Sequence, residues 1–249
     1  MKEQITNENK TLIDFWDRFY TLSEEDKKEI SSGALESFEQ LAPSEKLLAA
    51  ACELGSRNKV LDLGCGNGWA AIAAAKSGCP SVTAADPAPN AADTAGLFAR
   101  VLGVDEQVTA VCCPDGWLKD VPDEAYDGFI CCCVLDVVPP ETAEEILREA
   151  ARILAPDAAV VIGLNARLDP EAAAEKGVEL TEDGRVIQEG VLRLVSKTDE
   201  EWEGILSRYF TVEGKEYFGW PGETEEKRRI FRLRKKPNGS NDGTRKERL

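Results

Sequence analysis

Residues 59–69 read KVLDLGCGNGW, an apolar run that passes into a glycine-rich turn. Gly64, Gly66 and Gly68 stand at every second position, and Asp62 precedes the first of them by two residues. A turn built from glycine lets a ligand approach the backbone closely, because no Cβ stands in the way. The spacing differs from the G-x-G-x-x-G loop of dinucleotide-binding proteins. We therefore interpret the stretch as a buried strand, a ligand-binding turn and the start of a helix.

Strands and helices alternate on the C-terminal side of this turn. Apolar runs predict strands in residues 60–63, 82–85, 108–112, 128–135 and 158–164, with helices near 68–77, 90–102 and 140–154. Such alternation indicates a parallel sheet covered by helices on both faces. Residues 210–220 and 229–233 predict two closing antiparallel strands. The expected fold class is α/β, a doubly wound, mostly parallel sheet with helices on both faces and an antiparallel C-terminal edge hairpin.

The chain divides around this sheet into further segments. Residues 1–55 are interpreted as an N-terminal helical lid or cap, and residues 56–235 as a Rossmann-like domain. Within that domain, residues 165–208 are expected to form an insertion and a helix that cover an acceptor site, with a hairpin turn at 182–184. Residues 236–249 are predicted to be a disordered basic tail.

The chain contains no histidine. Imidazole is the commonest general base and metal ligand near neutral pH. Its absence argues against Ser-His and Cys-His nucleophiles and against most catalytic zinc or iron sites, so no metal is expected. The eight cysteines include adjacent pairs and a triplet without C-x-x-C spacing, and we interpret most of them as reduced, small apolar side chains.

Charge and hydropathy limit the partners of the protein. The net charge is −16; residues 227–249 hold ten Lys/Arg and two acids, which leaves 20 basic and 44 acidic residues, a net −24, in the first 226. That charge repels phosphate backbones and argues against nucleic acid as a partner. No run approaches 18 apolar residues and the start lacks an apolar signal core, so no membrane partner is expected and the predicted location is cytoplasmic. Nothing in the sequence indicates the oligomeric state.

The turn at residues 62–68 resembles the first motif of class I S-adenosylmethionine-dependent methyltransferases. The resemblance covers residues 58–164 and implies a Rossmann-like fold with S-adenosylmethionine as cofactor. It assigns the ribose hydroxyls to Asp86, 22 residues after Gly64, and adenine to Asp115 and Gly116. A turn-initiating role for Asp86-Pro87 is the structural alternative. One departure from the family pattern is Asp157-Ala158, where a glycine pair is usual.

The residues implied to hold the cofactor are Asp62, Gly64, Cys65, Gly66, Asn67, Gly68, Asp86, Pro87, Asp115, Gly116, Cys132 and Tyr20. Trp16 and Phe19 join Tyr20 as candidates to close over cofactor or acceptor, although an aromatic stripe at helical spacing also suits a core. Cys133 and Asp136 follow the fourth strand, at the edge where open parallel sheets bind ligands. We interpret both as catalytic residues near the methyl group, with Asp136 as the candidate base and strand-end packing as the alternative.

The leading functional hypothesis is methyl transfer to a small-molecule acceptor that the sequence does not name. One alternative is methylation of a protein or RNA, with the basic tail as the docking element. Another is a non-catalytic regulator or interaction protein that binds S-adenosylmethionine. A soft acceptor such as arsenite, suggested by the cysteines, is a lesser possibility. The glycine spacing argues against a nicotinamide-dependent dehydrogenase.

Overall fold

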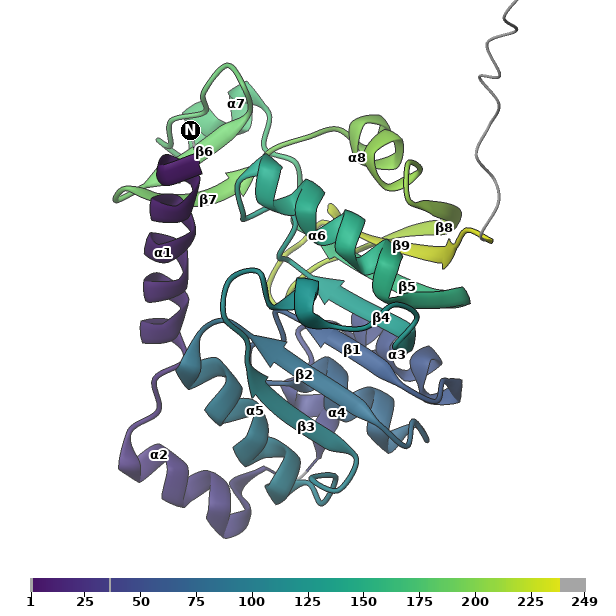
Figure 1. The fold of residues 1–249 in the computed structure, drawn as a ribbon. Coiled ribbons are helices and arrows are strands. Elements are labelled where there is room, and N and C mark those ends of the chain that lie inside the picture. Colours follow the sequence, from purple (N-terminus) through teal and green to yellow (C-terminus); the bar gives the residue numbers. More distant parts are fainter. Residues whose placement is uncertain (1, 36, 238–249) are drawn as a thin grey trace, which may run out of the picture.

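A seven-stranded sheet with the strand order β3-β2-β1-β4-β5-β9-β8 organises the chain (Figure 1). The computed structural model describes residues 2–35 and 37–237. Strands β1 to β5 pair in parallel, whereas β9 pairs antiparallel with both β5 and β8. The predicted fold class is confirmed, including the antiparallel hairpin at the C-terminal edge. The predicted disordered tail lies, from residue 238 onward, outside the described residues.

The strands are β1 (Val60–Leu63), β2 (Val82–Asp86), β3 (Val108–Cys112), β4 (Tyr126–Cys132), β5 (Leu154–Leu164), β6 (Arg185–Gln188), β7 (Val191–Val195), β8 (Phe210–Phe218) and β9 (Arg228–Lys235). The α-helices are α1 (Lys2–Phe19), α2 (Glu24–Glu29), α3 (Glu45–Glu53), α4 (Trp69–Lys76), α5 (Pro89–Val101), α6 (Pro140–Ile153), α7 (Pro170–Glu175) and α8 (Asp199–Leu206). Short helical turns are η1 (Ile30–Ala34), η2 (Phe38–Leu41), η3 (Leu54–Ser56) and η4 (Trp117–Asp120).

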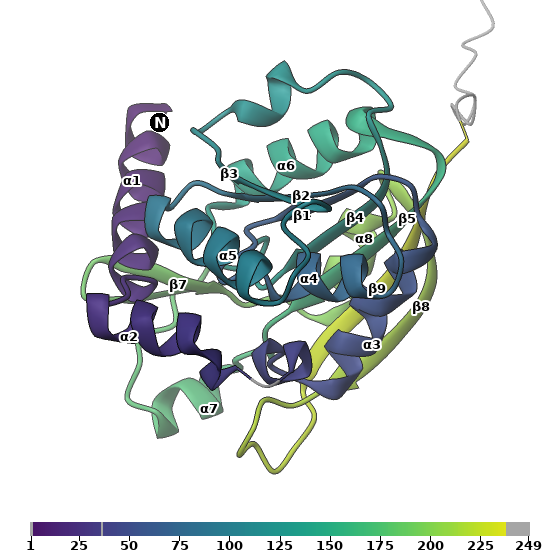
Figure 2. The same cartoon turned by 90° about the horizontal axis from the view of Figure 1, so that it is seen from below.

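Both faces of the sheet are buried, and two hydrophobic clusters occupy them. On β4, Phe129 and Cys131 belong to the cluster that includes residues of α6 and α8, whereas Ile130 belongs to the cluster of α3, α4 and α5. This division follows from the alternation of side chains along a strand. Figure 2 shows the sheet between α6 and the group α3, α4 and α5. The helices thereby leave the ends of the strands as the place where a ligand site can form.

Two strands, β4 and β5, differ from their predicted bounds by three residues or more at one end. β4 was expected to reach Leu135 but ends at Cys132, because Cys133 adopts a positive φ of 56° that a strand cannot continue through. The apolar run goes on because Leu135 is buried in the core without being part of a strand. β5 begins at Leu154 rather than at 158, directly after α6.

A small second sheet, β6 and β7, stands outside the main one. The predicted turn at 182–184 is present, since Gly184 N donates to the carbonyl of Thr181 and Leu180 bridges to Val186. The β6–β7 hairpin itself turns through Glu189 and Gly190, which the sequence did not predict. We call α7, β6 and β7 (residues 170–195) the cap. Figure 1 shows α1 running from the cap to α5.

The basic residues of the last strand have acidic neighbours. Arg232 pairs with Glu53 and Glu216, and Arg234 pairs with Glu213. These pairs neutralise part of the charge on the outer strands. None of the helices described combines the length and the apolar character that crossing a bilayer requires.

Candidate active site

The glycine turn between β1 and α4 is the local feature on which the site is built. Gly64 and Gly66 have φ values of +70° and +54°, in the left-handed region that side chains rarely adopt. A Cβ at Gly64 would overlap Cγ2 of Val134, and one at Gly66 would overlap the hydroxyl of Tyr20. The backbone of the turn is therefore packed so closely that only glycine fits at both positions.

Asp62 lies behind the turn and is only 2% exposed. Its Oδ2 accepts a hydrogen bond of 3.1 Å from the backbone N–H of Ala71, in the first turn of α4. Helix α4 begins after Gly68, which has no side chain to cap it, so a strand residue supplies the acceptor that a capping side chain usually provides. Asp62 therefore fixes the helix that follows the turn. It does not line the cavity described below.

Burial raises the pKa of Asp62 from 3.8 to about 7. Between those two values the folded chain binds more protons than the unfolded chain, so the free energy of unfolding falls as the pH rises toward 7 and levels off above it. Asp62→Asn removes this dependence and keeps an acceptor oxygen for Ala71. Between about pH 5 and about pH 8, the wild type should lose about 2 to 3 kcal/mol more stability than the variant. Urea unfolding at both pH values measures the difference, and equal losses would contradict it.

Asp86 ends β2 and faces the same turn. Its Oδ2 accepts from Gly66 N at 3.0 Å, and its Oδ1 accepts from Ala88 N at 2.9 Å. The side chain is 7% exposed, and burial raises its pKa. Each carboxylate oxygen can accept a second hydrogen bond, so the carboxylate retains capacity for two hydroxyl donors. The turn-initiating contact to Ala88 and a ligand-binding role are therefore compatible.

One cavity of about 1320 Å³ opens at the carboxyl ends of the parallel strands. Ten of the predicted site residues line it: Tyr20, Gly64, Cys65, Asn67, Asp86, Pro87, Asp115, Gly116, Cys132 and Cys133. Asp62, Gly66, Gly68 and Asp136 are not part of the lining. A Cβ at Gly116 would meet nothing within 4 Å, so the loop after β3 leaves open space beside its backbone.

Cys132 and Cys133 form part of the wall at the end of β4. Side chains alternate along a regular strand and would point to opposite faces, but the left-handed backbone at Cys133 lets both line the cavity. Burial raises the pKa of both thiols well above the ordinary value, which keeps them protonated near neutral pH. A protonated thiol is a poor nucleophile and a small apolar surface. The geometry does not supply a thiolate at this position.

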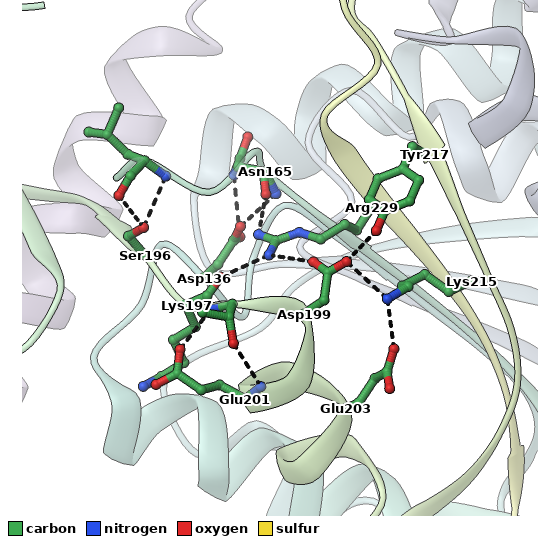
Figure 3. A network of polar contacts seen from close by, with 12 residues as sticks. Asp136, Asn165, Ser196, Lys197, Asp199, Glu201, Glu203, Lys215, Tyr217 and Arg229 are labelled. Atoms are coloured by element: carbon green, nitrogen blue, oxygen red, sulfur yellow. Dashed lines mark hydrogen bonds and ion pairs between the residues drawn. The ribbon is translucent and has the colours of Figure 1, made fainter. Parts of the chain in front are cut away.

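Asp136 lies behind the cavity wall rather than in it. Its side chain is fully buried, and Oδ2 accepts from Asn165 N at 2.6 Å while Oδ1 accepts from Asn165 Nδ2 at 3.3 Å (Figure 3). Burial raises its pKa to about 6. Both oxygens are directed at Asn165, which lines the cavity, and Asp136 itself is not part of the lining. This position corresponds to the structural alternative, in which Asp136 holds a loop, and gives no geometric support to its expected role as base.

Arg229 of β9 extends the same polar network beneath the site. The buried guanidinium donates to the carbonyls of Asn165 and Lys197 and pairs with Asp199 at 3.3 Å. Asp199 in turn accepts from Lys215 and Tyr217 of β8 (Figure 3). The network ties the loop after β5 to the edge hairpin and so fixes Asn165 from two sides.

Some lining residues were not predicted. Asn165 follows β5 at the same sheet edge as the other site residues, so the rule that placed Cys133 could have found it. Trp220 lies in the segment between β8 and β9, Arg228 is the first residue of β9, and the Arg228 guanidinium lies 4.0 Å from the Trp220 ring centroid. No local pattern marks that segment as part of a site.

Trp16, Phe19 and Tyr20 were the aromatic residues of the N-terminal segment that were candidates to close over cofactor or acceptor. All three line the cavity.

The strand order, the glycine turn after the first strand and the acidic residue that ends the second define the Rossmann-like class I methyltransferase fold. Residues 60–157 match the family model described as a methyltransferase domain.

Sequence similarity to a curated protein is local. The ribosomal protein L11 methyltransferase of Herpetosiphon aurantiacus is 38% identical over 91 residues, which are 36% of this chain. The chain matches only 27% of the length of that relative.

Solved structures resemble the chain over a longer range. The 1,6-didemethyltoxoflavin-N1-methyltransferase of Burkholderia thailandensis, with bound 1,6-didemethyltoxoflavin and S-adenosylhomocysteine, superimposes with a TM-score of 0.60 at 18% identity, covering 87% of this chain and 92% of that chain. An N-methyltransferase of Bradyrhizobium japonicum WM9, in complex with S-adenosylhomocysteine, gives 0.56 at 18% identity, covering 80% and 87%. At these identities the likeness establishes the fold.

Proposed function

We propose that the protein transfers a methyl group from S-adenosylmethionine to a small-molecule acceptor bound in the cavity. The observation that carries the proposal is the continuity of this cavity. It joins the glycine turn and Asp86 at one end to Asn165, Trp220 and the cap at the other, so cofactor and acceptor have one shared space. The methyltransferase-domain match and the neighbours that contain S-adenosylhomocysteine support the identity of the cofactor.

The cofactor end fits an adenosyl group. Asp86 would accept the two ribose hydroxyls with the lone pairs that Gly66 and Ala88 leave available. Gly116 would admit the adenine ring, because its backbone borders open space, and Asp115 would accept from the exocyclic amine. Tyr20 packs over the glycine turn from the N-terminal side and would cover the bound cofactor.

Bound S-adenosylmethionine would supply the electrophilic methyl group. The task of the chain is then to hold the acceptor in line, exclude water and provide an uncharged wall. Cys132 and Cys133 contribute protonated thiols to that wall, and Asp136 positions Asn165. We propose alignment rather than side-chain proton transfer as the main contribution, because no histidine exists in the sequence and Asp136 is turned away.

We further propose that residues 1–55 and 165–208 cover the acceptor, with residues 56–235 as the catalytic domain. Segments of both, α1 and the cap, line the cavity. A cytoplasmic location is also proposed, and it agrees with eight cysteines that form no disulfide in the structure.

A protein side chain is the second candidate acceptor. The observation in its favour is the local identity to a ribosomal protein methyltransferase. The cap favours the small molecule, since its residues line the cavity together with α1 and would cover an acceptor bound there.

The proposal predicts that the protein forms S-adenosylhomocysteine from S-adenosylmethionine when it is given a metabolite extract of low molecular weight. The same protein truncated after residue 235 should retain this activity, because the proposal gives the basic tail no part in binding a small-molecule acceptor. Chromatographic measurement of S-adenosylhomocysteine provides the readout, with boiled protein as control. Activity that requires a protein fraction and disappears on truncation would favour the second candidate, and no product with any fraction would favour a non-catalytic binder.

A further inference from the structure

The cap side of the cavity carries positive charge in a strongly acidic protein. Arg167, Lys176 and Arg193 line this side, and none of them forms an ion pair within the part of the chain that the structure describes. The chain has 46 acidic residues against 30 basic ones. In a protein of that net charge, three cations without a paired acid on one side of a single cavity make the potential on that side positive, which favours an anion.

Arg193 is held more firmly than the other two. It lies on β7, is partly buried, and its guanidinium carbon lies 4.1 Å from the Phe15 ring centroid and 5.9 Å from that of Trp16. Stacking on aromatic rings orients a guanidinium while leaving its N–H edge available. Among the described residues, no group accepts a hydrogen bond from the Arg193 guanidinium. A planar set of donors with no partner suits bidentate binding of a carboxylate or phosphate.

Arg228 provides an internal comparison in the same cavity. It also stacks on an aromatic ring, that of Trp220, but it donates to both carboxylate oxygens of Glu223 and to Asn165. Its charge is therefore already compensated. Among the other acids that line the cavity, Glu145 and Glu149 are paired with basic residues. Asp86, Asp115 and Glu141 have no ion pair among the described residues, and none of the three belongs to the cap. The charge that remains on the cap side is positive.

The rest of that side is apolar. Leu12 and Trp16 of α1, Val138 after β4, and Leu168 and Leu192 near the cap all line the cavity. A small molecule with an apolar part and one anionic group would bury the apolar part against these side chains and place the anionic group at Arg193.

We infer that the acceptor is an apolar or aromatic small molecule that carries an oxyanion, a carboxylate or a phosphate, and that Arg193 binds this group. The inference rests on the proposed function, because it assigns the acceptor class of the same cavity. Arg167 and Lys176 at the exposed rim raise the local concentration of anions, and Arg193 makes the direct contact.

The test compares ligands that share one aromatic body and differ in charge. Binding of 2-naphthoate, 2-naphthyl phosphate and the uncharged 2-naphthamide is measured by calorimetry on the full chain saturated with S-adenosylhomocysteine. At least one of the two anions should bind roughly tenfold more tightly than the amide, and which one does so distinguishes carboxylate from phosphate. Arg193→Gln should abolish the preference, and Arg193→Lys should retain part of it. Arg100→Gln, which removes the same charge from the exposed face of α5, should leave the preference unchanged.

The affinity for S-adenosylhomocysteine itself, measured in the same experiment, reports on the proposed function separately. It should be equal in the wild type and in Arg193→Gln. Anions that bind no better than the amide, including no detectable binding of either, would overturn the inference. So would a preference that survives Arg193→Gln, or a loss confined to S-adenosylhomocysteine, which would assign Arg193 to the cofactor carboxylate.

Discussion

Replacing Asp86 with alanine is expected to weaken the binding of S-adenosylhomocysteine by about two orders of magnitude or more. The carboxylate would hold two ribose hydroxyls, and a hydrogen bond to a charged group contributes about 1.5 to 3 kcal/mol. The substitution also removes the acceptor of Gly66 N, which holds the middle of the glycine turn in place. Calorimetry with the purified variant measures the loss.

A matched control separates the site from the overall charge. Asp93→Ala removes a carboxylate from the exposed side of α5, outside the cavity lining, and should leave the affinity unchanged. In a thermal unfolding experiment the wild type gains about 2.7 kcal/mol at a ligand concentration 100 times the dissociation constant. Asp86→Ala should show almost none of this gain at the same concentration. A full gain in that variant would remove Asp86 from the site.

Gly64→Ala is expected to destabilise the fold and abolish cofactor binding together. An alanine at a φ of +70° is strained by about 1 to 2 kcal/mol, and here its Cβ also overlaps Cγ2 of Val134. Valine is branched at Cβ and has little rotamer freedom with which to yield. The total loss should therefore reach about 3 kcal/mol or more. Urea unfolding at equilibrium measures it.

Gly103 offers the control for backbone strain alone. Its φ is +65°, close to that of Gly64, but an added Cβ would meet nothing within 4 Å. Gly103→Ala should cost only about 1 to 2 kcal/mol and leave binding of S-adenosylhomocysteine intact. Equal losses in the two variants would show that the contact between the turn and Val134 contributes nothing.

The sequence predicted the fold and the cofactor end because both depend on local patterns. Short apolar runs marked β1 to β5, and the glycine spacing marked a turn in which Gly64, Gly66 and Gly68 all adopt positive φ. Asp86 could be located because the carboxyl ends of neighbouring parallel strands meet at one edge of the sheet. Those signals require only residues that are close in the sequence or in adjacent strands.

The acceptor end could not be predicted in the same way. Trp220 and Arg228 reach the cavity because the closing hairpin folds back beside β5, a contact between segments more than 60 residues apart, as the bond from Arg228 to Asn165 shows. Asp136 looked catalytic because an acid after the fourth strand suits the edge of the sheet. Its orientation toward Asn165 depends on the turn at Cys133, where the backbone leaves the strand earlier than the apolar run predicts.

The central claim is that the glycine turn and Asp86 together hold an adenosyl group. A crystal structure of the full chain with S-adenosylhomocysteine tests it most directly. The account predicts the ribose hydroxyls on the Asp86 carboxylate and the amino acid part of the ligand beside residues 64–68. A cavity that stays empty at saturating ligand, or a ligand bound away from Asp86, would contradict it.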